Sequence, residues 1–242
     1  MIKLNKLSKY FGKTKVLERI DLDIPDGDSL AVIGPSGCGK STLLKLLIRL
    51  EDSTFGSVQV NGRDIAKMGE EELIGLREKI GFIFQSGALF DSLNVYENVA
   101  FALREHASIT ESEIARTVRE KLKMVELEGT ENLMPAELSG GMQKRVGIAR
   151  ALAFNPSIIL YDEPTTGLDP ITSLTIEDLM IKLSRELKVT SIVVTHVMQT
   201  VYRVAKRIVM LHEGKIVEVG SPEQAKKTEN KIVKNFITGG RE

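Results

Sequence analysis

The sequence predicts an α/β fold: a mixed sheet flanked by helices, with an N-terminal antiparallel β part and an inserted α-helical subdomain. Residues 1–33 contain short strand patterns separated by a turn, which predicts the antiparallel part. Two β-branched apolar runs, Ser157–Tyr161 and Thr190–Thr195, are typical of buried parallel strands. Over residues 86–154 the apolar spacing becomes helical, which predicts the inserted subdomain.

The elements expected in the first part of the core are, in chain order, strands over Ile2–Leu7, Val16–Ile24 and Ser29–Ile33, a helix from Lys40 to about Leu50, a hairpin from Ser57 through Asn61-Gly62, and a strand over Ile80–Phe84. Within the helical part, Thr110 and Glu113 form a capping-box pattern that predicts a helix start.

The C-terminal part of the chain should contain a late hairpin, formed by Lys206–Leu211 and Lys215–Val219. Ser221 and Pro222 then supply the cap and first-turn proline of a C-terminal helix. The apolar residues of Gln224–Ile237 have amphipathic spacing, and we expect them to pack on the chain's own core.

These elements predict a single domain over residues 1–242, in which 1–85 and 155–242 form the core and 86–154 the helical subdomain. The 33 Lys and Arg balance the 33 Asp and Glu, which argues against a nucleic-acid-coating protein. Cys38 is the only cysteine, so no internal disulfide can form. No window approaches the roughly 20 apolar residues that cross a bilayer, so a membrane role would need a spanning partner.

The segment from Gly34 to Thr42 has the pattern of a phosphate-binding loop between a strand and a helix: Gly34-Pro35-Ser36-Gly37-Cys38-Gly39-Lys40-Ser41-Thr42. Backbone N–H groups of such a loop surround phosphates, the lysine reaches the outer ones, and the Ser41 hydroxyl can bind Mg²⁺. The pattern predicts a P-loop nucleoside-triphosphatase core. Cys38 occupies a variable position, where we expect it to fill space.

A buried strand pattern over Ser157–Tyr161 ends in two carboxylates. Asp162, at the tip of the strand, can hold Mg²⁺, and Glu163 can act as the general base that polarises an attacking water. Alone, these would be ordinary loop carboxylates. Combined with the phosphate loop, they predict a hydrolytic site.

Two more polar residues follow predicted strands of the same sheet. Gln85 follows Ile80–Phe84, and His196 follows Thr190–Thr195. Residues at the carboxyl ends of parallel strands face the ligand crevice of the sheet. Gln85 could therefore contact Mg²⁺ or the attacking water, and His196 the γ-phosphate.

A second anion-binding pattern lies about a hundred residues after the first, in the octapeptide Leu138-Ser139-Gly140-Gly141-Met142-Gln143-Lys144-Arg145. A serine and two glycines at a helix start leave unpaired N–H groups that favour a phosphate. The chain therefore either binds two anions or shares one nucleotide with a second copy of itself.

Taken together and in this order, the motifs resemble the ATP-binding subunits of ABC transporters over essentially the whole chain. The matching motifs are the phosphate loop or Walker A 34–42, the Q-loop Gln85, the signature 138–145, the Walker B strand 158–163, the D-loop 167–169 and the H-loop His196. The signature octapeptide is specific to that family. One departure is Val197, where the family often has an aspartate after the histidine.

The resemblance implies an ATPase that uses ATP and Mg²⁺, with Ser41, Gln85 and Asp162 at the metal. It implies a head-to-tail homodimer in which Ser139-Gly140-Gly141 of one copy face the nucleotide of the other. Phe11 would stack on the adenine, with Tyr10 as the rival. The partners would be integral membrane permeases, which place the subunit peripherally at the cytoplasmic face of an inner membrane.

The residues after Gln85 point to a subgroup. The amino-acid sequence from Phe84 to Leu93 is similar to that of the Mla-type ATPases of phospholipid trafficking, which have relatives in Mce systems and plastid lipid importers. This implies lipid cargo and a possible lipid-binding partner protein. The alternatives are the ATPase of an amino-acid importer or a lipoprotein exporter, or a non-transport ABC protein.

Overall fold

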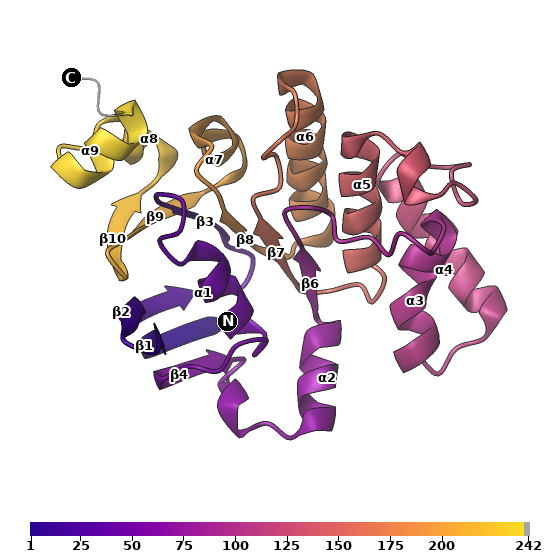
Figure 1. Ribbon diagram of the computed structural model, residues 1–242, viewed down its shortest axis with the longest axis horizontal. Helices are drawn as coiled ribbons and strands as arrows, with labels where there is room; N and C mark the ends of the chain where they lie inside the picture. The colour runs from indigo at the N-terminus through magenta and orange to yellow at the C-terminus, as the bar shows by residue number, and fades with distance from the viewer. Residues whose placement is uncertain (240–242) are drawn as a thin grey trace.

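The computed structural model describes residues 1–239, whose strands form two sheets (Figure 1). An antiparallel sheet has the order β2-β1-β4-β5, and a mostly parallel sheet has the order β10-β9-β3-β8-β7-β6. The strands are β1 (Ile2–Phe11), β2 (Thr14–Ile24), β3 (Ser29–Ile33), β4 (Phe55–Val60), β5 (Arg63–Asp64), β6 (Ile80–Ile83), β7 (Ile158–Asp162), β8 (Thr190–Val194), β9 (Arg207–His212) and β10 (Lys215–Gly220). The predicted fold class is confirmed.

Helices flank the parallel sheet, and α3, α4 and α5 gather at the end of the molecule away from β10 (Figure 1). The helices are α1 (Lys40–Leu47), α2 (Glu70–Glu78), α3 (Val95–His106), α4 (Glu111–Met124), α5 (Gly140–Ala151), α6 (Pro170–Leu187), α7 (Met198–Val204), α8 (Pro222–Lys226) and α9 (Lys231–Thr238). Within residues 1–239, no helix combines the length and apolar character needed to span a membrane.

The parallel strands β3, β7 and β8 are buried along their whole length, as β-branched central strands should be. Neighbouring parallel strands end at the same level: Ile83 of β6 pairs with Tyr161 of β7, and Asp162 of β7 pairs with Val194 of β8. Polar residues that follow these strands therefore emerge at one edge of the sheet, which is where parallel sheets bind ligands.

Two large apolar clusters hold the two ends of the molecule together. One lies between the antiparallel sheet, α1 and the parallel sheet, and contains Leu4, Leu44 and Leu160. The other joins α3, α4, α5 and α6 to the opposite face of the parallel sheet around Tyr161. Because β7 contributes alternate side chains to both clusters, the end of β7 is held from two sides.

The structure corrects two sequence expectations. Helix α2 was not predicted, although Leu73 and Leu76 form a buried side after its acidic first turn. Within 86–154 the first helix begins after Asn94, which caps α3 and accepts a hydrogen bond from the Glu97 amide at 2.8 Å, in agreement with the helix-start pattern of Asn94 and Glu97. The segment Gln224–Ile237 is two helices rather than one, because Asn230 caps a new helix, α9. As expected, that segment packs on the chain's own core, where Val233 is buried.

Candidate functional site

The phosphate loop connects β3 to α1 in a conformation that its glycines permit. Gly34 has φ of 150°, and a Cβ there would lie 2.3 Å from the carbonyl oxygen of Leu211. Gly39 occupies the N-cap of α1 with φ of 105°, and no described side chain caps that helix. The first amides of α1 therefore face the loop without a capping partner, as a phosphate-binding helix start requires.

Lys40 points back over this loop. Its side chain is 6 % exposed, and its Nζ donates hydrogen bonds to the carbonyl oxygens of Gly34 and Pro35 at 2.8 and 2.9 Å. The ammonium group is therefore held above the loop, where it can neutralise a bound phosphate.

Asp162 ends β7 next to the first turn of α1. The Ser41 hydroxyl donates a hydrogen bond to Asp162 Oδ1 at 2.8 Å. Burial raises the pKa of Asp162 above its ordinary value, although the Ser41 bond acts in the opposite direction. A hydroxyl and a carboxylate side by side form the kind of oxygen donor set that Mg²⁺ shares with phosphates and water. The predicted metal residues Ser41 and Asp162 therefore fit a magnesium ion.

Glu163 follows at once, in the left-handed conformation with φ of 49°. Its Oε1 lies 2.9 Å from His196 Nδ1 and 3.8 Å from Lys40 Nζ. Its Oε2 accepts hydrogen bonds from the hydroxyls of Thr195 and Thr166 at 2.8 and 2.9 Å. Burial raises the pKa of Glu163, but the hydrogen bonds from His196, Thr195 and Thr166 outweigh it, so its pKa lies below the ordinary value. The carboxylate is therefore ionised and fixed in orientation at neutral pH.

Sequence reasoning had missed Thr195 and Thr166. Thr195 could have been found, because it ends the same strand pattern that placed His196 in the crevice. Thr166 can donate to Glu163 because the backbone at Glu163 is left-handed, and no sequence pattern predicts that conformation.

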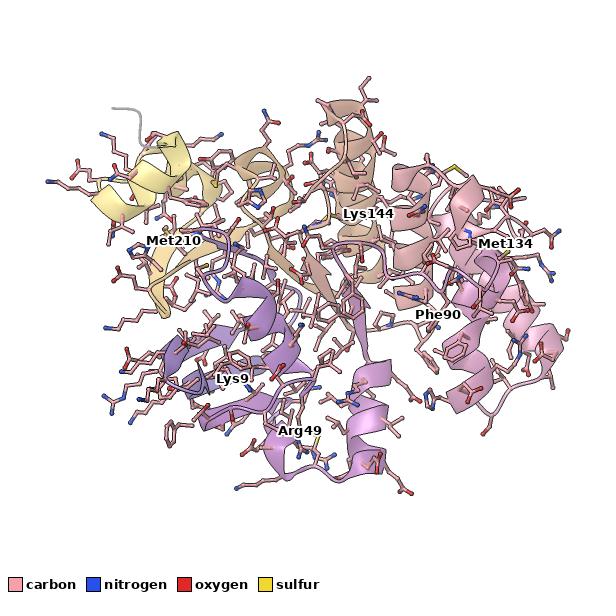
Figure 2. All side chains as sticks on the ribbon, in the orientation of Figure 1. Lys9, Arg49, Phe90, Met134, Lys144 and Met210 are labelled. Atoms are coloured by element: carbon pink, nitrogen blue, oxygen red, sulfur yellow. The ribbon has the colours of Figure 1, made fainter. Side chains whose placement is uncertain are left out.

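One pocket of about 330 Å³ brings together most residues of the phosphate loop with Gln85, Glu163 and His196. Its described lining is Val16, Ser36, Gly37, Gly39, Lys40, Ser41, Thr42, Gln85, Glu163 and His196. The predicted site residues that are not among its lining are Phe11, Gly34, Pro35, Cys38, Asp162 and the start of α5. Gln85 reaches it from the end of β6, and its backbone oxygen accepts a hydrogen bond from Lys144 of α5. Figure 2 shows Lys144 on the side of α5 that faces the sheet. Segments far apart in the sequence thus meet at one edge of the parallel sheet.

The two candidate adenine contacts differ in their surroundings. Phe11 is 48 % exposed, and Lys9 Nζ lies 4.6 Å from its ring centroid. Tyr10 instead packs edge-to-face on Phe55, with ring centroids 5.9 Å apart. Phe11 is thus the more exposed of the two rings, with Lys9 over one of its faces. Cys38 is partly buried, and burial raises the pKa of its thiol, so it fills space as expected.

The octapeptide opens α5. Ser139 is the N-cap, and its side chain accepts a hydrogen bond from the Met142 amide at 3.3 Å. Ser139 and Gly140 are exposed, whereas Gly141 is buried: a Cβ there would lie 2.4 Å from Thr172 Cγ2 on α6. The side-chain position of Gly141 therefore faces α6, and the predicted contact of Gly141 with a nucleotide would use its backbone amide in the first turn of α5. The exposed start of α5 consists of Ser139 and Gly140.

This exposed helix start does not belong to the pocket around Lys40. None of the described lining residues of that pocket comes from α5, and α6 stands between α5 and α7 in Figure 1. One chain therefore presents an anion-binding helix start outside its own nucleotide pocket.

Asp169 lies in the turn before α6. Its side chain caps α6 by accepting hydrogen bonds from the amides of Ile171 and Thr172.

The arrangement can position a triphosphate and activate water. The amides of α1 and Lys40 can bind phosphate oxygens, and Glu163, held by three donors, can take a proton from a water in line with the outer phosphate. His196 lies beside that carboxylate and can hold the transferred group.

Comparison with known proteins gives consistent matches. A family model described as ABC transporter matches residues 17–166. The chain is 42% identical to the methionine import ATP-binding protein MetN 2 of Enterococcus faecalis, covering 98% of this chain and 70% of that protein. It is 38% identical to the intermembrane phospholipid transport system ATP-binding protein MlaF of Haemophilus influenzae, covering 99% and 90%.

One solved structure is similar to this chain over most of its length. It is the dimeric, post-hydrolysis state of the ATP-binding cassette MJ0796 bound to ADP and Pi, with a TM-score of 0.81 and 37% identity. The match covers 90% of this chain and 98% of that one.

Proposed function

The chain belongs to the ABC transporter family of ATP-hydrolysing subunits, and from this premise we propose that it drives a membrane complex that moves phospholipids. The observation that carries the catalytic part is the convergence of Lys40, Glu163 and His196 in one pocket. The cargo part is supported by the similarity to MlaF and by the residues after Gln85.

In the proposed reaction, the pocket binds ATP with its phosphates on the loop 34–42. Lys40 neutralises the outer phosphates, Glu163 accepts the proton of the attacking water, and His196 holds the γ-phosphate. Ser41, Asp162 and Gln85 would hold Mg²⁺, which when bound would supply positive charge that neutralises the phosphates. Phe11 is the proposed adenine contact.

We propose that two copies associate head to tail. The start of α5 then closes the nucleotide pocket of the partner with Ser139 and Gly140, which are exposed in one chain. The dimeric state of the similar MJ0796 cassette supports the association of two copies. In this arrangement the ligand of the anion-binding start of α5 would be the nucleotide bound by the partner.

The proposed permease contact is an apolar groove beside the segment that follows Gln85. Its aromatic lining is Phe82, Phe84, Phe90, Phe101 and Phe154. Phe90 and Phe101 are 44 % and 43 % exposed, with ring centroids 4.9 Å apart (Figure 2 labels Phe90). A short amphipathic helix of a membrane partner fits such a groove. The subunit would then lie peripherally at the cytoplasmic face of the inner membrane.

Replacing Phe101 with aspartate should release the permease without affecting nucleotide binding. The new charge would be desolvated in the groove when the partner docks, and Phe101 lies outside the nucleotide pocket. Phe55→Asp is the matched control, because Phe55 is 62 % exposed but lies on β4. Co-purification of the permease from solubilised membranes of the native host measures the effect. Retention by Phe101→Asp, or equal loss in Phe55→Asp, would contradict the groove assignment.

The cargo is tested on the complex purified through this subunit and reconstituted in vesicles. Phospholipid cargo predicts bound phospholipid in the purified complex and ATP-dependent movement of labelled phospholipid between vesicles. Free methionine should neither bind nor stimulate ATP turnover. Methionine uptake without lipid movement would instead support the amino-acid importer, the main alternative.

A further inference from the structure

Helix α7 begins directly after His196 without a side-chain cap among the described residues. Val197 occupies the N-cap and has no side-chain acceptor, and its own amide donates to the Thr195 hydroxyl at 3.1 Å. An uncapped helix start leaves amides without side-chain partners and is less stable than one capped by serine or aspartate. No described side chain caps the segment after His196, so its anchors are the bond between His196 and Glu163 and contacts further along α7.

A buried polar cluster attaches α7 to α6 one turn later. The Thr200 hydroxyl donates to Glu177 Oε1 at 2.7 Å, and Glu177 Oε2 lies 3.2 Å from Arg203 Nε. Thr200 is 0 % exposed and Glu177 3 %. Residues three apart in a helix share a face, so Thr200 and Arg203 approach the same carboxylate. The Thr200 hydroxyl is hydrogen-bonded to Oε1, whereas Oε2, with Arg203 Nε at 3.2 Å, has no hydrogen-bond partner among the described residues.

The cluster also reaches the loop that follows the general base. The Thr165 and Thr200 hydroxyls lie 2.9 Å apart in the interior. The next residue, Thr166, donates to Glu163 Oε2. Thr200 therefore connects the loop carrying Glu163 with the helix that follows His196.

This cluster costs more than an apolar contact would. Burying a carboxylate is unfavourable, and replacing buried ionic groups with apolar side chains is often neutral or stabilising. Glu177 does not line the pocket around Lys40. We therefore look for its role in the geometry of the segments that it joins.

We propose that Thr200, backed by Glu177 and Arg203, is a positioning residue that sets the spacing between His196 and Glu163. This role rests on the proposed catalytic functions of those two residues. Thr200 replaces the missing cap at Val197 as the anchor of the His196 segment. Thr200 does not line the pocket around Lys40, so we expect it to affect turnover and not ATP affinity.

The first test compares Thr200→Val with Thr200→Ser. The valine is nearly isosteric but lacks the hydroxyl, so kcat should fall about tenfold, while KM and the Kd for ATP change less than about twofold. The serine keeps the hydroxyl and should recover most of the turnover. Thr175→Val is the control, because that hydroxyl bonds only to Ile171 of its own helix. Turnover of Thr200→Val within twofold of the wild type would overturn the proposal.

The second test restores a cap. In Thr200→Val, adding Val197→Ser should recover at least half of the lost turnover, whereas Val197→Ala should not. Amide exchange of the nucleotide-free protein supplies a separate readout: the Val201 amide, bonded to Val197 at 3.2 Å, should exchange faster in Thr200→Val and slow again with the serine cap. Equal behaviour of the serine and alanine variants would overturn the proposal.

Glu163→Gln, measured alongside, separates this inference from its premise. Loss of turnover in Glu163→Gln with full turnover in Thr200→Val would overturn the positioning role alone. Normal turnover in Glu163→Gln would overturn the assignment of the base and the positioning role with it.

Discussion

Replacement of Glu163 by glutamine should lower ATP turnover by about 100- to 1000-fold and leave ATP binding intact, because a positioned base contributes this much to proton transfer. Glutamine has the same shape. Its amide oxygen can accept the bonds from Thr195 and Thr166, and its amide nitrogen can donate to a neutral His196. The variant should therefore fold normally but be unable to take the proton.

The same variant should accumulate an ATP-bound dimer, since hydrolysis is what would reopen it. Turnover is measured by phosphate release, nucleotide affinity with a fluorescent ATP analogue, and the dimer by light scattering with and without ATP. Glu126→Gln is the matched control: Glu126 is exposed, lies away from the pocket and has a similar left-handed φ of 59°. Normal turnover in Glu163→Gln would eliminate the base assignment.

The convergence of the proposed site residues was predictable because their positions depend on local pattern and strand order. The phosphate loop has fixed spacing, and Asp162, Gln85 and His196 each follow a buried strand. Once those strands are parallel and in register, their ends must share an edge. The sheet thus converts separate sequence motifs into one pocket.

Contacts that depend on packing between helices were not predictable. The burial of Gly141 arises from Thr172 on α6, and the support of Gln85 comes from Lys144 on α5. Periodicity identifies the apolar side of a helix but not which residue of a neighbouring helix faces it. The break between α8 and α9 was missed for another reason: amphipathic spacing continued across a local cap at Asn230.

The shared-site arrangement is tested at Gly140, where Gly140→Asp should abolish turnover but leave ATP binding by the single chain unchanged. A Cβ at Gly140 would meet only Leu168, at 3.7 Å, and an acidic residue suits a helix start, so the fold should persist. Two unit charges 4 Å apart repel by about 4 kcal/mol at an effective dielectric of 20, which predicts at least a 100-fold loss. Gly69→Asp, at the exposed start of α2, is the control.

Mixing two inactive variants decides whether the partner completes the site. Lys40→Ala damages the phosphate loop but keeps an intact α5, and Gly140→Asp does the reverse. In a head-to-tail dimer of the two, one pocket carries both defects and the other carries neither. An equal mixture places half of the chains in mixed dimers, so about one quarter of the wild-type turnover should return if the pockets act independently.

If the start of α5 served its own chain's nucleotide, every pocket in the mixture would retain a defect, and no turnover would return. Recovery therefore distinguishes a shared site from two separate anion sites, which the activity of either variant alone cannot do. Because neither substitution lies in the apolar groove, the experiment needs only the ATPase subunit and is independent of cargo. The exposed Ser139 and Gly140 then have one function, which is to close the partner's pocket.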